Sequence, residues 1–139
     1  IGAGTPWHQA IDHPGAFQMG HLARLFQSRP FHKLQPRQDI IVDGPQTGGA
    51  KIRAAAARDG SFAFIYSPRG EKFSIDKSKL AAETIRESWF DPRYGTITPI
   101  HSAKTKGFQT YTPPTNGRGN DWLLILDDAS KGFPVDILR

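Results

Sequence analysis

Paired carboxylates are the first residues in this sequence that could do acid–base chemistry, and Asp127 and Asp128 form such a pair. Two carboxyl groups that cleave a glycosidic bond must face each other across the sugar, about 5–9.5 Å apart. Sequence neighbours on a strand point to opposite faces, so we expect both aspartates to cap the loop that follows them. Asp91 precedes Pro92 and is well placed to accept hydrogen bonds from turn amides. The sequence therefore predicts structural roles for these acids.

The other residue types that carry chemistry do not form a local site. The five histidines show no spacing of two, three or four residues, and there is no cysteine. A Gly-x-Ser-x-Gly nucleophile motif is absent, and the loop 44–49 lacks the Lys-Ser/Thr ending of a phosphate-binding loop. We therefore expect no catalytic residue, no metal and no cofactor within this chain. The histidines are His8, His13, His21, His32 and His101.

Exposed aromatic side chains are the remaining candidates, because binding modules hold sugars by stacking them on aromatic rings. The best candidates are Tyr94 at the tip of a turn, Tyr111 before two prolines, and Trp7 in the opening loop. Docking against a neighbouring domain is the alternative role for all three. Other large side chains alternate with apolar residues and are expected in the core. This predicted core contains Phe64, Trp89, Trp122, Leu124 and Leu126.

The elements that must position these residues are one helix followed by strands. Between Gly15 and Ser28 the apolar residues recur every three or four positions, which predicts a helix that ends before Pro30. An extended connector, 31–37, follows, and then the apolar period becomes two. Short strands at roughly ten-residue spacing predict an all-β, antiparallel β-sandwich of about seven to nine strands with one N-terminal helix. The expected strands are 39–43, 51–57, 61–66, 72–76, 84–90, 96–100, 107–112 and 122–127.

Length and charge narrow the class of protein. A chain of 139 residues forms one domain, and no apolar run approaches the roughly 20 residues that span a membrane. The net charge of +5 comes from scattered Lys and Arg, which argues against nucleic-acid binding and leaves anionic polysaccharide or acidic partners open. The absence of cysteine is compatible with secretion. The chain opens on Ile1 without a Met, so we expect a removed signal or, more simply, a piece of a longer polypeptide.

Several motifs in order along the chain carry a resemblance to a known family. They are Pro6–Ala16, Met19, Leu22, Ser28–Pro30, Arg53–Ala55, Phe64–Tyr66, Trp89–Arg93, Gly95, Asp121–Trp122 and Leu126–Ser130. The first part resembles the end of the barrel and the linker in apiosidase-like glycoside hydrolases. From Gln38 onward the chain resembles the sandwich fused behind that barrel, named "putative collagen-binding domain of a collagenase". Tyr94 departs from the family, in which Thr is usual.

The resemblance implies a secreted or periplasmic bacterial protein whose hydrolytic carboxylates lie upstream of Ile1. Residues 1–31 would then be the end of the catalytic barrel with its linker helix, and 32–139 the C-terminal sandwich. The implied function is a non-catalytic accessory module that packs against the barrel and supports it. An independent binding module for collagen or glycan is the alternative. We also expect the helix stripe of Met19, Leu22 and Phe26 to cover only an edge of the sandwich and to leave an exposed apolar patch.

Overall fold

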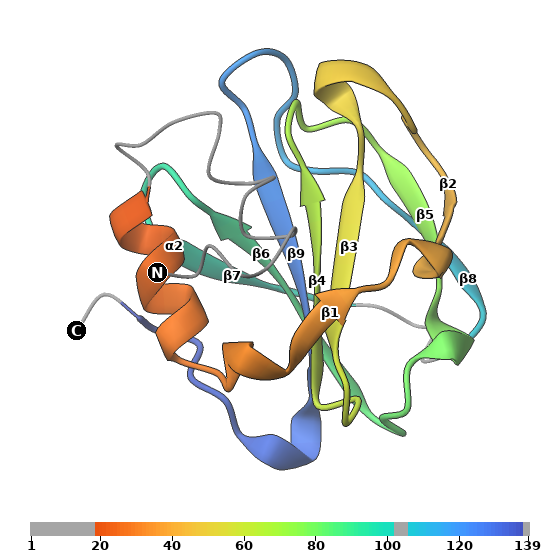
Figure 1. The fold of residues 1–139 in the computed structure, drawn as a ribbon. Coiled ribbons are helices and arrows are strands. Elements are labelled where there is room, and N and C mark those ends of the chain that lie inside the picture. The colour runs from red at the N-terminus through yellow and green to blue at the C-terminus, as the bar shows by residue number, and fades with distance from the viewer. Residues whose placement is uncertain (1–18, 102–105, 138–139) are drawn as a thin grey trace.

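Two antiparallel sheets and one helix make up the structure, a computed structural model that describes residues 19–101 and 106–137, Met19 in its backbone only (Figure 1). Within these residues there are nine strands and one α-helix, α2 (Met19–Gln27). The first sheet has six strands in the order β1 (Leu34–Pro36), β3 (Arg53–Ala57), β4 (Phe62–Ser67), β9 (Trp122–Asp128), β6 (Ile85–Asp91) and β7 (Thr96–Ile100). The second has the order β2 (Ile41–Asp43), β5 (Phe73–Asp76) and β8 (Phe108–Tyr111). The predicted all-β, antiparallel sandwich is confirmed.

Strand β4 shows why the six-stranded sheet is central. Phe62, Phe64 and Tyr66 point to one face, and Ala63 and Ile65 point to the other. All five are buried, since β4 lies between β3 and β9 and both faces of the sheet are covered. Strand β9 has the same character and pairs with β4 on one side and β6 on the other. An apolar run on both faces is typical of a strand that is covered from two sides.

Two apolar layers form the core, one on each face of the six-stranded sheet. The layer between the two sheets holds the side chains of Trp89, Trp122, Leu124 and Leu126. The other layer, between the sheet and α2, holds Phe64. All five residues are buried, so the predicted core is confirmed.

Helix α2 belongs to this core, and the expectation of a half-exposed stripe is wrong. Leu22, Leu25 and Phe26 are buried against the six-stranded sheet, and the Phe26 ring lies 5.7 Å from the ring of Phe64. The physical reason is visible in Figure 1: the three-stranded sheet covers one face of the larger sheet, and α2 covers the other. The side chain of Met19 lies outside the described residues. The domain boundary at residue 31 stays a prediction, with α2 on its N-terminal side packed against the sandwich.

The first strands differ from prediction in their details. The expected connector contains β1, an edge strand that pairs with the end of β3. Its Pro36 has no N–H to donate, and proline is tolerated in sheets mainly at edges. The expected strand 39–43 begins as a short 3-10 turn, Gln38–Ile40, before β2. By contrast, the hairpin about Arg58-Asp59-Gly60 is confirmed, with Gly60 at a φ of 77° and its N–H bonded to the Ala57 carbonyl at 2.9 Å.

Candidate functional site

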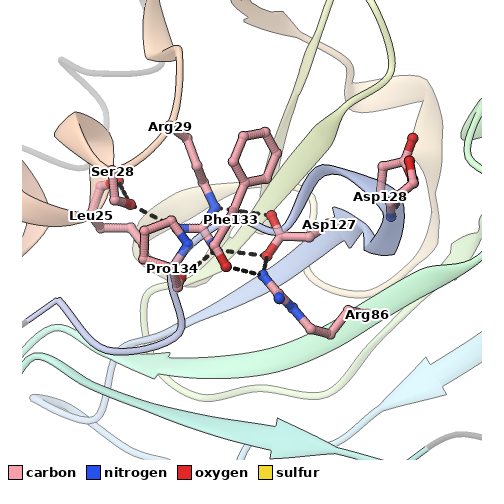
Figure 2. Close-up of polar contacts among 9 residues, drawn as sticks. Leu25, Ser28, Arg29, Arg86, Asp127, Asp128, Phe133 and Pro134 are labelled. Atoms are coloured by element: carbon pink, nitrogen blue, oxygen red, sulfur yellow. Dashed lines mark hydrogen bonds and ion pairs between the residues drawn. The ribbon is translucent and has the colours of Figure 1, made fainter.

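A buried polar cluster surrounds Asp127, near the end of β9 (Figure 2). Arg29, just beyond α2, donates from Nε to Oδ1 at 2.9 Å and from Nη2 to Oδ2 at 2.6 Å. Arg86 of β6 donates from Nη2 to the same Oδ2 at 2.8 Å. The Arg29 pair is bidentate, and the side chains of Arg29 and Asp127 are each only 1% exposed. One carboxylate thus holds two guanidinium groups from distant parts of the chain.

The same two arginines also hold the C-terminal segment. Arg29 Nη2 donates to the Pro134 carbonyl at 3.1 Å, and its guanidinium lies 5.4 Å from the centre of the Phe133 ring. Arg86 Nη2 donates to the Phe133 carbonyl at 2.7 Å. The cluster therefore ties three segments together: the end of α2, the two strands β6 and β9, and the chain that follows β9. It acts as a clamp, and we call these residues (Arg29, Arg86, Asp127) the Asp127 clamp.

Asp127 and Asp128 have different roles, as Figure 2 shows. Asp128 points away from the clamp and accepts hydrogen bonds from Ser130 N at 3.0 Å and from Ser130 Oγ at 2.7 Å. These bonds lower the pKa of Asp128, and its predicted capping role is confirmed. The capping role predicted for Asp127 is wrong, because its two oxygens are occupied by arginines. The two side chains point apart and are held by different residues, whereas an acid–base pair must face each other across a sugar.

The turn between β6 and β7 is held rigidly by Asp91 and Arg93. Asp91 Oδ1 accepts from the Arg93 backbone N–H at 2.9 Å and from Arg93 Nε at 2.9 Å, which confirms its predicted bonding to turn amides. Arg93 Nη1 reaches Asn120 Oδ1 at 3.0 Å, and the guanidinium lies 5.2 Å from the centre of the Trp122 ring. At the tip of this turn, Tyr94 is 68% exposed. Tyr94, one of the predicted ligand-binding residues, therefore has the exposed ring that was expected of it.

The other two predicted ligand-binding residues are placed differently. Trp7 lies outside the described residues. Tyr111 is buried, so its expected exposure is wrong: its ring stacks on Phe73 at 6.0 Å and meets Trp89 edge-on at 6.4 Å. Burial, with the nearby charge of Glu87, raises the pKa of Tyr111. Tyr94 and Tyr111 thus do not form one site.

Two buried polar pairs were not predicted from the sequence. In the layer between the two sheets, Lys77 Nζ donates to Glu87 Oε2 at 2.5 Å. In the layer between the six-stranded sheet and α2, the Tyr66 hydroxyl donates to Asp121 Oδ2 at 3.0 Å. Burial raises the pKa of Asp121 and of Tyr66. Each pair joins a strand residue to a residue outside the strands, Lys77 in a 3-10 turn and Asp121 just before β9, so nothing in the local sequence marks it. Among residues 19–101 and 106–137, no group of three or more His, Asp or Glu could hold a metal ion.

The buried carboxyl of Asp121 gives a pH dependence that can be measured. Because burial raises the pKa of Asp121 in the folded state, this carboxyl holds its proton to a higher pH in the folded protein than in the unfolded chain, whose value is about 4. The contribution of Asp121 to stability therefore falls as the pH rises above about 4. We expect Asp121→Asn to be least favourable at pH 4 and to gain stability relative to wild type towards pH 7. Urea unfolding of both proteins across this range measures the difference. A difference that stays constant, or shrinks as pH rises, would show that burial does not control this group.

The fold and these clusters define a class: an antiparallel β-sandwich domain with a clamped helix and, within the described residues, no assembled catalytic set. More particularly, the chain belongs to the family described as "Putative collagen-binding domain of a collagenase", whose model matches residues 35–127. No curated protein sequence is significantly similar to it.

Solved structures extend the likeness beyond the family match. A protein titled "Glycoside hydrolase" is 25% identical, with a TM-score of 0.76, over 96% of this chain and 29% of its own. A glycoside hydrolase family 5 structure from Bacteroides vulgatus ATCC 8482 shares the fold at 23% identity and a TM-score of 0.76, over 92% of this chain and 28% of its own. The chain thus spans less than a third of the length of either relative.

Proposed function

We propose that this chain is the accessory β-sandwich module of a glycoside hydrolase, non-catalytic itself, which packs against the catalytic barrel and supports it. The observation that carries this proposal is the coverage of the solved relatives. Nearly the whole of this fold recurs in a glycoside hydrolase, but it accounts for only 29% of that protein. The remaining part of such a protein is large enough to hold a catalytic domain.

The clamped helix supports the proposed packing. Helix α2 is fixed to the six-stranded sheet by its apolar side chains and by Arg29, which follows its last residue. A domain that precedes the described residues would be followed in the polypeptide by a helix that is itself fixed on the sandwich. Such a connection restricts the orientations that the two domains can take. Support of the barrel would follow from this restriction.

The acidic residues of the described chain support a non-catalytic role. The clamp neutralises Asp127, Asp128 caps the turn after β9, and Asp91 holds its own turn. Glu87 is paired with Lys77 in the core. We propose that the hydrolytic carboxylates lie in the upstream barrel and that the parent protein is exported by a bacterium, to the periplasm or the medium. No helix in residues 19–101 and 106–137 is long and apolar enough to cross a membrane.

Activity assays test the non-catalytic role. The chain on its own is expected to release no product from aryl glycosides, polysaccharides or gelatin. In the parent polypeptide, deletion of this module is expected to lower the melting temperature of the catalytic domain, because the barrel loses its supporting surface. Differential scanning calorimetry of the parent with and without the module measures this effect. Turnover by the isolated chain that survives repurification and is lost on one substitution within residues 19–137 would contradict the proposal.

The second candidate function is an independent binding module for collagen or glycan. The family description and the solvent-exposed ring of Tyr94 favour it. The two functions differ in what the isolated chain does. A binding module retains a ligand when separated from the barrel, whereas a purely supporting module retains none and affects only the stability of the barrel.

A further inference from the structure

We propose that Tyr94 and Arg118 form a binding site for an acidic polysaccharide, one whose sugars carry carboxylates. The site lies at the end of the sandwich where the β6–β7 turn meets the loop between β8 and β9. Arg93 bridges the two, since its Nη1 donates to the Gly119 carbonyl at 3.3 Å and to Asn120 Oδ1 at 3.0 Å. This proposal goes beyond the supporting role and does not depend on it.

The Tyr94 turn is ordered before any ligand arrives. The Tyr94 and Gly95 backbone N–H groups both donate to the Asp91 carbonyl, at 3.3 and 2.7 Å, and Gly95 takes a positive φ of 74°. Thr115 Oγ1 donates to Asn120 Oδ1 and accepts from Trp122 Nε1, each at 2.9 Å, which fixes the neighbouring loop. A preordered turn loses little conformational entropy on binding, so an exposed ring on it contributes more of its contact energy to affinity.

The same end of the sandwich carries arginines without carboxylate partners. Arg118 is exposed and Arg69 is half-buried, and neither makes an ion pair with the described residues. Their loops are joined, because the Gly117 backbone N–H donates to the Arg69 carbonyl at 2.8 Å. A guanidinium that is not already paired can take a carboxylate in a two-point hydrogen bond. The net charge of +5 further favours a polyanion over a neutral ligand.

An exposed ring on one turn, and an exposed guanidinium on the loop that Arg93 ties to that turn, fit a polysaccharide of uronic acids. One sugar can stack its apolar face on Tyr94 while a carboxylate of the same polysaccharide binds Arg118. A nucleic acid is the competing polyanion, but it is typically held by a continuous basic stripe with several stacking aromatics. Within the described loops at this end, Tyr94 is the only aromatic side chain that is largely exposed. The surface therefore favours the polysaccharide.

Affinity electrophoresis of the intact 139-residue chain tests the site, with polygalacturonate as the acidic probe and dextran as the neutral one. Wild type should be retarded by polygalacturonate, less so as salt rises, and should run freely in dextran. Tyr94→Ala and Arg118→Ala should each weaken retardation about fivefold or more, the scale of a binding hot spot. Neither residue lies in the core, so both variants should melt as wild type does.

Two variants serve as matched controls. Phe108→Ala removes a ring of similar exposure, 63%, at the far end of β8, and Arg58→Ala removes an exposed arginine in the β3–β4 hairpin. Both should bind polygalacturonate as wild type does. The proposal is overturned if wild type is not retarded, if dextran retards it equally, or if the control variants lose as much as the site variants. Tighter binding to a short single-stranded DNA, insensitive to Tyr94→Ala, would also overturn it and would identify a nucleic-acid surface.

Discussion

A chain that begins at His32 is expected to lose its cooperative fold, since it lacks the helix that covers one face of the six-stranded sheet. The deletion removes Leu22, Leu25 and Phe26 from the core. Burial of each such side chain contributes about 1.5–3 kcal/mol, and the whole domain is stable by only about 5–15 kcal/mol. Removal of Arg29 also takes away the bidentate partner of the buried Asp127. These losses together approach the total stability.

Near-ultraviolet circular dichroism and thermal unfolding measure the effect of this deletion. We expect the shortened chain to lose fixed aromatic packing and to show no sharp transition. Gln27→Ala in the full chain is the matched control, because Gln27 is exposed on the same helix and should leave the melting temperature unchanged within about 1 °C. A shortened chain that melts cooperatively near the wild-type temperature would place the helix outside the folding unit.

Substitution of the adjacent aspartates should separate the clamp from the cap. Asp127→Ala leaves Arg29 buried without its carboxylate and is expected to destabilise the fold by about 3–5 kcal/mol. Asp128→Ala removes hydrogen bonds at the surface and should reduce stability much less than Asp127→Ala does. The two variants lose the same atoms at neighbouring positions. The difference between their losses of stability therefore reports the different surroundings of the two carboxylates. Chemical denaturation at pH 7 measures both.

A double variant distinguishes the buried charge from the packing. Replacing Arg29 by Met and Asp127 by Leu together removes both buried charges and fills the space with apolar atoms. Such exchanges of a buried ion pair are often neutral or stabilising, so the double variant should recover most of the loss seen in Asp127→Ala. Equal stability of Asp127→Ala and Asp128→Ala would refute the clamp.

The sequence predicts those parts of the fold that depend on local pattern. The alternation in β4 and the apolar run of β9 identified both central strands, and the Asp59-Gly60 pair identified the hairpin between β3 and β4. The helix was also predicted, but its partner was not. An apolar stripe indicates that one face of a helix is buried, but it does not identify the element against which that face packs. The apolar residues on both faces of β4 were the signal that the larger sheet needs a second cover.

Prediction of the candidate site was limited by distance along the chain. The Asp127 clamp joins residues 98 positions apart, so no spacing rule could pair Arg29 with Asp127. Tyr94 was found because it lies within the turn that contains Pro92 and ends at Gly95. Tyr111 shares its turn signal of nearby prolines, but it is the last residue of β8 and faces the other sheet. Gln109, two positions earlier, is polar, so the apolar alternation that would have marked Tyr111 as inward-facing is interrupted in this strand.

The place of β9 in the larger sheet has a consequence for synthesis on the ribosome. Strands β4 and β6 do not pair with each other; both pair with β9, which ends at Asp128 and is the last strand of the described chain. The six-stranded sheet therefore stays open until the residues up to Asp128 have left the exit tunnel. Until then, the edges of β4 and β6 that pair with β9 in the folded protein have no partner. Pairing across such sequence distances is slow. A ribosome that stalls before β9 should leave an aggregation-prone nascent chain that needs chaperone protection, even if every earlier strand has been made.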